Sequence, residues 1–336
     1  RRRDWGKYSP YRGPPDQVHG AYSAHHLSSV FVIFAYMDTI RSFEQEALEC
    51  LTALYEPSEA REIARQLLEE VRGCTRTQLL LLSKDTLLSP AECARLERML
   101  HDLSAGTPLQ YILGYAYFAG HRLTVAPGVL IPRPETEELI ELILQHPESR
   151  ASQRLLDVGT GSGCIAYALT AALPEVSQSV ALEVSSEAAP IAEANFEALR
   201  KATGREVYLW KHDLFTLLEE HTPPTPPLDL IVSNPPYIHP EEAEEMTPQV
   251  LLHEPHLALF APEASPIAYY IALAELVAQG YLRSGGNLWV ELNPLYATAT
   301  EEAMLERIGR RHAKTKLIHD LSGKVRFLHL TYCPAE

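Results

Sequence analysis

The chain has 336 residues, 46% of them hydrophobic, and a formal net charge of −15 at pH 7. This length is enough for two domains, and this composition is enough to bury a sizeable core. The first 36 residues carry a net charge of +3, which leaves −18 on the remainder. Such an acidic body argues against a protein that holds nucleic acid mainly by neutralising phosphates, so we expect no stable nucleic-acid binding.

The five cysteines are scattered, odd in number and without a Cys-x-x-Cys pair. We therefore expect neither a disulfide framework nor a metal site, and a reducing cytoplasmic location is the simplest interpretation. The apolar run at 30–37 is much shorter than the roughly 20 residues that a membrane span needs. No association with a membrane is expected.

Residues 1–36 begin with Arg and are rich in Tyr, Pro, His and Gly, without a sustained period. We interpret this stretch as a disordered extension, or as upstream sequence read through from a misplaced start before Met37.

From residue 37 the pattern becomes helical, with apolar residues every three or four positions. The first stripe is Ile40, Phe43, Ala47, Leu51 and Leu54. Pro57 interrupts it, and Ser58 is expected to cap a second helix. A third helix is expected to begin after Ser89, where Glu92 would complete a capping box. These elements predict a small helical domain at 37–107, which would serve in packing or in substrate recognition.

Residues 108–132 are rich in strand formers and are punctuated by Gly114, Gly120 and Gly128. The strand formers are Tyr111, Ile112, Tyr117, Phe118, Leu123, Val125 and Val129. The pattern predicts a β-hairpin that bridges two domains.

Strands and helices alternate from about residue 154 to the end of the chain. We expect strands at 154–159, 179–184, 206–212, 228–233, 287–292 and 326–332. Helices are expected at 163–173, 186–203, 266–283 and 298–310. This alternation predicts an α/β domain at 133–336, with a mostly parallel sheet covered by helices.

The first of these strands runs into the glycine-rich sequence LLDVGTGSG at 155–163. The candidate cofactor-binding residues of this loop are Gly159, Thr160, Gly161, Ser162 and Gly163. Glycines let a backbone approach a ligand closely, and the following helix start offers free N–H donors. Dinucleotides, phosphates and S-adenosylmethionine all bind such loops, although the missing Gly-Lys-Ser/Thr disfavours a Walker-type phosphate site.

Three acidic residues lie at or just after the ends of the first three strands, and they narrow the choice of ligand. Asp157 would repel a pyrophosphate but suits the ammonium group of a methionine moiety. Glu183 stands where an acid accepts both hydroxyls of a ribose, which NAD and S-adenosylmethionine share. Asp213 stands where an adenine edge would lie. The alternatives are that Asp157 caps the turn, that Glu183 is solvated, and that Asp213 has no ligand role.

The fourth strand ends in the tetrad Asn234, Pro235, Pro236 and Tyr237. An amide nitrogen is a poor nucleophile because its lone pair is delocalised. The side-chain oxygen of Asn234 and the carbonyl of Pro235 could accept both of its N–H bonds and aim the lone pair at a methyl donor. Tyr237 could stack on the planar group. The alternative is a proline-rich turn that merely ends a strand.

From residue 37 onward the chain resembles the HemK-type peptide chain release factor glutamine methyltransferases. Four segments carry the resemblance: PLQYILG at 108–114, LIPRPETE at 130–137, the tetrad at 234–237 and DLSGKVR at 320–326. The resemblance implies a small N-terminal helical domain joined to a Rossmann-like class I methyltransferase domain with a seven-stranded sheet. It also implies methylation of the glutamine in the Gly-Gly-Gln loop of release factors.

By the same resemblance, residues 159–163, Glu183, Leu214 and Asn234 bind S-adenosylmethionine, and the tetrad binds the substrate glutamine. Arg133 would shape the substrate pocket, unless it only pairs with Glu135 or Glu137 on the surface. The chain departs from the family pattern at Glu183, where Asp is more usual, and at Leu214, where an aromatic residue often lies beside the adenine.

Other functions remain open from the sequence. The tetrad is shared with nucleic-acid adenine-amine methyltransferases, and ribosomal-protein glutamine methyltransferases are related enzymes. A binding module with a vestigial cofactor site is a further alternative. The Pro-Arg-Pro-Glu-Thr-Glu segment favours the release-factor enzymes among these.

Overall fold

The structure is a computed structural model, and it describes residues 37–334. Within this range the chain forms two compact units, one of 37–114 with 247–253 and the other of 115–246 with 254–334. The expected extension at 1–36 lies outside the described residues. Between residues 37 and 334, no helix combines the length and the apolar character that crossing a membrane requires.

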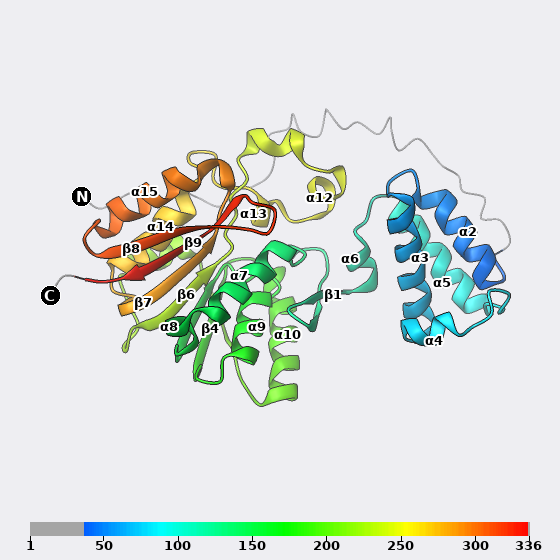
Figure 1. Cartoon of the computed structure of the whole chain (residues 1–336), viewed down its shortest axis with the longest axis horizontal. Helices are drawn as coiled ribbons and strands as arrows, with labels where there is room; N and C mark the ends of the chain where they lie inside the picture. The colour runs from blue at the N-terminus through cyan, green and yellow to red at the C-terminus, as the bar shows by residue number, and fades with distance from the viewer. Residues whose placement is uncertain (1–36, 335–336) are drawn as a thin grey trace. The chain divides into compact units, whose positions relative to one another are not determined.

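The smaller unit is built from short and medium helices (Figure 1). They are α2 (Ile40–Leu51), α3 (Pro57–Arg72), α4 (Arg76–Leu80), α5 (Pro90–Ser104), α6 (Leu109–Leu113) and α12 (Pro248–His253). The apolar stripes expected from the sequence meet in one core, which includes Phe43, Leu67, Leu68, Leu96 and Leu100. Leu54 is an exception, because it lies beyond the end of α2 and is 43% exposed. The three helices predicted for 37–107 are therefore confirmed.

Of the two N-caps predicted for these helices, one is confirmed and the other is wrong. Ser89 Oγ accepts from the N–H of Glu92, and Glu92 Oε2 accepts from the N–H of Ser89, so the expected capping box is present. The prediction that Ser58 caps α3 is wrong, because Glu56 is the N-cap and Pro57 is the first helical residue. Proline suits that position because its φ is preset and no N–H is needed there.

A hairpin is present in the segment predicted for it, but it is shorter than expected and belongs to the larger unit. It consists of β1 (Tyr115–Phe118) and β2 (His121–Thr124), paired antiparallel. Tyr111 and Ile112 were expected in a strand, but they lie in α6. Ile112 packs against the core of the helical unit, so tertiary packing overrides its β propensity.

The larger unit contains a seven-stranded sheet of strand order β5-β4-β3-β6-β7-β9-β8. The strands are β3 (Arg154–Val158), β4 (Gln178–Glu183), β5 (Tyr208–Lys211), β6 (Leu228–Ser233), β7 (Leu282–Glu291), β8 (Ala313–His319) and β9 (Val325–Tyr332). The first five are parallel, and β9 and β8 are antiparallel to their neighbours. The predicted α/β class with a mostly parallel sheet is confirmed.

Helices cover both faces of this sheet (Figure 1). One face packs against α7 (Pro134–Gln145), α9 (Cys164–Ala172) and α10 (Ala188–Thr203), and the other against α11 (Leu214–Glu220), α14 (Ala268–Ala278) and α15 (Ala297–Ile308). Consecutive residues such as Leu155 and Leu156 belong to opposite cores because strand side chains alternate. The remaining elements are α8 (Pro147–Arg150), η2 (Pro240–Glu245), α13 (His256–Leu259) and η3 (Pro294–Tyr296).

Two differences from the predicted elements have physical causes. Strand β8 was not predicted, because it is an edge strand with lysines on its outer positions and gives little apolar signal. The helix expected at 266–283 ends at Ala278, and β7 begins at Leu282. The early part of β7 is a bulge, since Leu228 pairs with Leu282 but Leu230 already pairs with Asn287. The Ser-Gly-Gly sequence at 284–286 is more typical of a turn than of a strand, which hides the start of β7 in the sequence.

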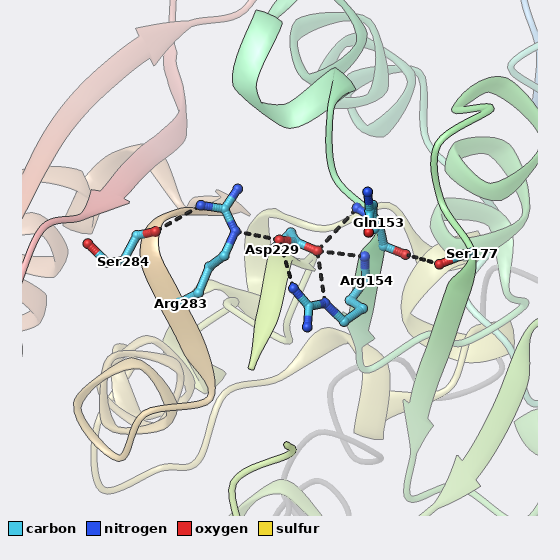
Figure 2. A network of polar contacts seen from close by, with 6 residues as sticks. All are labelled: Gln153, Arg154, Ser177, Asp229, Arg283 and Ser284. Atoms are coloured by element: carbon cyan, nitrogen blue, oxygen red, sulfur yellow. Dashed lines mark hydrogen bonds and ion pairs between the residues drawn. The ribbon is translucent and has the colours of Figure 1, made fainter. Parts of the chain in front are cut away.

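The bulge brings Arg283 to a buried carboxylate, Asp229, at the amino ends of the central strands (Figure 2). Asp229 accepts from the backbone N–H groups of Gln153 at 3.1 Å and Arg154 at 2.9 Å. Both guanidinium groups, of Arg154 and Arg283, also donate to it. One side chain thus joins β3, β6 and β7. Burial alone would raise the pKa of Asp229, but these donors outweigh it and hold that pKa below its ordinary value.

Replacing Asp229 by Asn is expected to lower the free energy of unfolding by about 2–4 kcal/mol at pH 7, because two partly exposed guanidinium groups lose the buried carboxylate that neutralises them. Urea unfolding measures the loss. Since the folded-state pKa lies below the unfolded value, the contribution is complete above about pH 4 and disappears as the pH falls further. Glu193→Gln removes the partner of Lys211 in an exposed pair and should change stability by less than about 0.5 kcal/mol.

Candidate active site

A pocket opens at the carboxyl ends of β3, β4, β5 and β6, where open α/β sheets bind their ligands. It holds about 1060 Å³ of empty space, part of it open to solvent, which is the size of a small-molecule site. Loops after these four strands and the segment at 128–136 line it. All of these residues belong to the larger unit.

The glycine-rich loop forms the floor of this pocket. Gly159 and Gly161 have φ values of 73° and 55°, and a Cβ added to either would meet no atom within 4 Å. The space above them is therefore free for a ligand. Gly163 has a different role, because a Cβ there would lie 2.7 Å from the ring of Phe196 on α10. It permits the close packing of two helices.

Asp157 lies behind the loop rather than in the pocket. Its side chain is fully buried, and Oδ2 accepts from Thr160 Oγ1 at 2.6 Å and from the N–H of Ala166 at 3.1 Å. Asp157 is not among the residues that line the pocket. Burial raises its pKa to about 7. The geometry is that of the turn-capping alternative, although Oδ1 has no hydrogen-bond partner among the described residues.

Glu183 lies at the end of β4, lines the pocket and is only 7% exposed, so it is not simply solvated. Its Oε2 accepts from the N–H of Gly161 at 2.8 Å, and its Oε1 accepts from the N–H of Ser185 at 2.7 Å. Each carboxylate oxygen can accept a second bond. Glu183 can therefore hold the glycine loop and accept ligand hydroxyls at the same time.

The end of the pocket next to β5 is lined by Asp213, Leu214 and Tyr269. Asp213 Oδ1 accepts from the N–H of Thr216 at 2.8 Å, so it caps α11 while it lines the site. Tyr269 comes from the first turn of α14, and its ring centroid lies 5.2 Å from that of Phe215. Tyr269 supplies an aromatic wall that Leu214 lacks. Tyr269 was not predicted from the sequence, because a tyrosine in the first turn of an apolar helix belongs to no recognisable motif.

The tetrad follows β6 at the other end of the pocket. Asn234, Pro235 and Pro236 line the pocket, and Asn234 Nδ2 donates to Thr136 Oγ1 at 3.0 Å. The carboxamide oxygen is thereby left to accept from a ligand. Tyr237 is not a lining residue. Its hydroxyl donates to Glu291 at 3.1 Å, so the expected stacking on a substrate stays a prediction.

Thr136 and Glu291 were not singled out from the sequence. Thr136 lies in the first turn of α7, and its hydroxyl donates to Glu291 Oε2 at 2.8 Å. Glu291 is the last residue of β7 and is 1% exposed. Burial raises its pKa to about 7, despite the donated hydrogen bonds. The one feature of the sequence that could have indicated Thr136 and Glu291 is their position at the start of a helix and the end of a strand, near the carboxyl edge of the sheet.

Arg133 lines the pocket and donates to Glu254 Oε1 at 2.5 Å. The side chain of Glu254 is 1% exposed, and its Oε2 accepts from the N–H of Ile131 at 3.0 Å. The alternative that Arg133 pairs with Glu135 or Glu137 on the surface is therefore wrong. A buried carboxylate more than a hundred residues away holds it, which only the fold could reveal.

Comparisons with known proteins identify relatives along most of the chain. A family model described as PrmC N-terminal domain matches residues 44–114, and one described as methyltransferase small domain matches 135–261. A release factor glutamine methyltransferase of Bacteroides thetaiotaomicron is 37% identical over 294 residues, which are 87% of this chain and 99% of that protein. One from Streptococcus pneumoniae is 40% identical over 220 residues, which are 65% of this chain and 74% of that protein.

Among solved structures, one is a protein-(glutamine-N5) methyltransferase (release factor-specific) from Alicyclobacillus acidocaldarius. It is 28% identical and covers 63% of this chain and 100% of its own, with a TM-score of 0.36.

The raised pKa of Glu291 predicts how the free energy of unfolding depends on pH. When folding raises the pKa of a group, the group stabilises the fold fully at pH values below its pKa in the unfolded chain. For Glu291 that unfolded pKa is 4.5, and the contribution is lost as the pH rises through about 7. Glu291→Gln, which stays neutral, should therefore gain about 1–3 kcal/mol of unfolding free energy relative to the parent protein between pH 5 and pH 8. Urea unfolding at both pH values measures this change. Equal pH dependence of the two proteins would contradict the prediction.

Proposed function

The chain belongs to the release factor glutamine methyltransferase family, and we propose on that premise that it transfers a methyl group from S-adenosylmethionine to the side-chain amide nitrogen of a glutamine in a translation release factor. The orientation of Asn234 carries the proposal most directly. Its amide nitrogen is occupied by Thr136, so its oxygen is free to accept from a substrate in the pocket.

The residues of the pocket fit S-adenosylmethionine. Gly159 and Gly161 leave open space over the loop, and Glu183 keeps acceptor capacity for the two ribose hydroxyls. Leu214 and Tyr269 provide apolar and aromatic walls for an adenine, with Asp213 beside them. When bound there, S-adenosylmethionine supplies an electrophilic methyl group. Asp157 would support the site through the loop that it braces from behind.

The tetrad is suited to an amide nitrogen. Asn234 Oδ1 and the carbonyl oxygen of Pro235 would accept the two N–H bonds of a glutamine side chain. The nitrogen lone pair would then point toward the methyl group, and no base has to remove a proton first. Positioning and fixed dipoles supply most of the rate in such a site. The neighbouring proline at 236 lacks an N–H, so it does not compete for these acceptors.

We also propose the finer assignment, the glutamine of the Gly-Gly-Gln motif. Glycines beside a glutamine allow the backbone to adopt conformations that extend the side chain into a narrow pocket. Arg133, held by Glu254, would line the entry of that side chain. The helical domain at 37–107 would recognise the body of the release factor, since it matches the family's N-terminal domain. The methyltransferase domain at 133–336 would supply the reaction.

Incubation of the protein with methyl-labelled S-adenosylmethionine and a purified release factor is expected to label the glutamine of the Gly-Gly-Gln motif, as located by peptide mass spectrometry. Asn234→Ala should lower the rate at least about 100-fold, since it removes an acceptor that aligns the nucleophile. A release factor with that glutamine changed to glutamate is the control and should stay unlabelled. Label in DNA, RNA or a ribosomal protein instead would refute the proposal.

Tyr269→Leu should weaken the binding of S-adenosylmethionine about 5- to 30-fold in isothermal titration, because an aromatic wall beside the adenine is lost. The matched control is Tyr208→Leu on β5, whose side chain is 67% exposed and outside the pocket. It should leave the affinity unchanged. If both variants bind the cofactor like the parent protein, Tyr269 has no part in the adenine site.

A further inference from the structure

Behind Asn234 lies a buried chain of hydrogen bonds, here called the Glu291 network, which consists of Asn234, Thr136, Glu291 and Tyr237. Asn234 Nδ2 donates to Thr136 Oγ1 at 3.0 Å, and Thr136 Oγ1 donates to Glu291 Oε2 at 2.8 Å. Tyr237 donates to Glu291 Oε1 at 3.1 Å. Three elements far apart in sequence, α7, β7 and the loop after β6, thus meet at one carboxylate.

The direction of every bond in this network follows from the ionised form of Glu291. A carboxylate can only accept hydrogen bonds, so the hydroxyl of Thr136 must donate its hydrogen bond to Glu291. Its oxygen is then an acceptor toward Asn234, and only the NH₂ side of the carboxamide can satisfy it. The carboxamide oxygen must therefore lie on the other side, where the substrate nitrogen would bind.

A neutral group at 291 would allow the opposite arrangement. A protonated carboxyl or an amide can donate to Thr136, whose own proton is then free to point at Asn234. The carboxamide of Asn234 could then turn by 180° about the Cβ–Cγ bond. It would present its NH₂ group, instead of its oxygen, to the NH₂ group of the substrate. Two donors facing each other forfeit a hydrogen bond, which should slow the transfer about 10- to 100-fold.

The surroundings of Glu291 support a role in orientation rather than in ion pairing. Among residues 37–334 no lysine, arginine or histidine forms an ion pair with it, and Arg326 on β9 is engaged by Asp320. The charged groups that act on Glu291 are Arg326 and Glu135. Its backbone carbonyl accepts from the hydroxyl of Tyr270 on α14 at 2.9 Å. The carboxylate is thus fixed in place, and burying it without a counter-ion is costly.

We propose that Glu291 and Thr136 are positioning residues, which hold the Asn234 carboxamide with its oxygen toward the substrate amide nitrogen. This inference rests on the proposed methyl transfer to glutamine and assigns the residues that set its acceptor geometry. Neither residue needs to touch the glutamine itself.

The first test compares Thr136→Val with Thr136→Ser. Valine keeps the shape of threonine but removes the hydroxyl, so kcat for a release factor should fall about 10- to 100-fold. The Kd of S-adenosylmethionine and the KM for the release factor should change less than about 3-fold. Serine keeps the hydroxyl and should restore kcat to within about 3-fold of the parent protein. The matched control is Thr170→Val in α9, which removes another buried threonine hydroxyl, one that donates to Ser179 on β4 at 2.8 Å, and it should leave kcat unchanged.

The second test uses Glu291→Gln and pH. In the parent protein kcat should rise with pH up to about 7, because deprotonation of Glu291 sets the bond directions. The Glu291→Gln variant should have a kcat about 10- to 100-fold lower than the parent protein at pH 8. The rise of kcat up to about pH 7, the acidic limb of the pH profile, should be absent from this variant. The groups facing Glu291 are Glu135 and Thr136 on α7, Arg326 on β9, Tyr237 after β6 and Tyr270 on α14. Glu135→Gln should retain the limb, with its midpoint moved to lower pH, because a nearby negative charge is removed.

A parent-like kcat in Thr136→Val would overturn the positioning role, and so would a serine variant as slow as the valine variant. These results differ from failure of the proposed function, in which the parent protein itself labels no release factor. In that case the positioning role can still be tested without methyl transfer, by NMR of the side-chain NH₂ group of Asn234. This resonance is assigned by its loss in Asn234→Asp. It should shift between pH 6 and pH 8 in the parent protein and not in Glu291→Gln. A resonance unmoved by pH in both proteins would overturn the inference.

Discussion

The arrangement of the catalytic edge depends on one buried carboxylate that accepts two hydroxyl protons. Glu291 receives the hydroxyls of Thr136 and Tyr237, and through Thr136 it determines which side of the Asn234 carboxamide faces the pocket. Since a carboxylate has no proton to donate, this choice follows from charge and not from packing alone. The first turn of α7, the end of β7 and the tetrad must therefore be formed together.

The sheet supplies the frame in which these parts can meet. At its amino edge Asp229 joins β3, β6 and β7 through backbone N–H groups and two guanidinium groups (Figure 2). With the strands fixed there, the opposite, carboxyl edge carries the glycine loop, Glu183 at the end of β4, and the tetrad. A buried acid thus stands at each edge of the sheet: Asp229 at the amino edge is paired with two arginines, whereas Glu291 at the carboxyl edge forms no ion pair among the described residues.

This difference separates stability from function. The donors around Asp229 lower its pKa, so its charge stabilises the fold at neutral pH. Burial raises the pKa of Glu291 and of Asp157 to about 7, so ionising either opposes folding. Asp157 holds the glycine loop and Glu291 holds the acceptor geometry. Proteins commonly retain such costly groups at functional sites, where a local loss of stability is compensated by the remaining core.

The sequence by itself determined the alternation of strands and helices, the glycine loop and the tetrad, because periodicity and short motifs are local properties. It could not show β8, whose lysine-bearing edge position hides its signal, or the bulge that places Arg283 beside Asp229. Only the tertiary structure decided that Arg133 pairs with Glu254, that Tyr269 lines the pocket and that Thr136 and Glu291 stand behind Asn234. These contacts join residues about 100 or more positions apart or depend on which way a helix faces. A hydrogen-bond direction is set by neighbours in space, and no spacing along the chain encodes it.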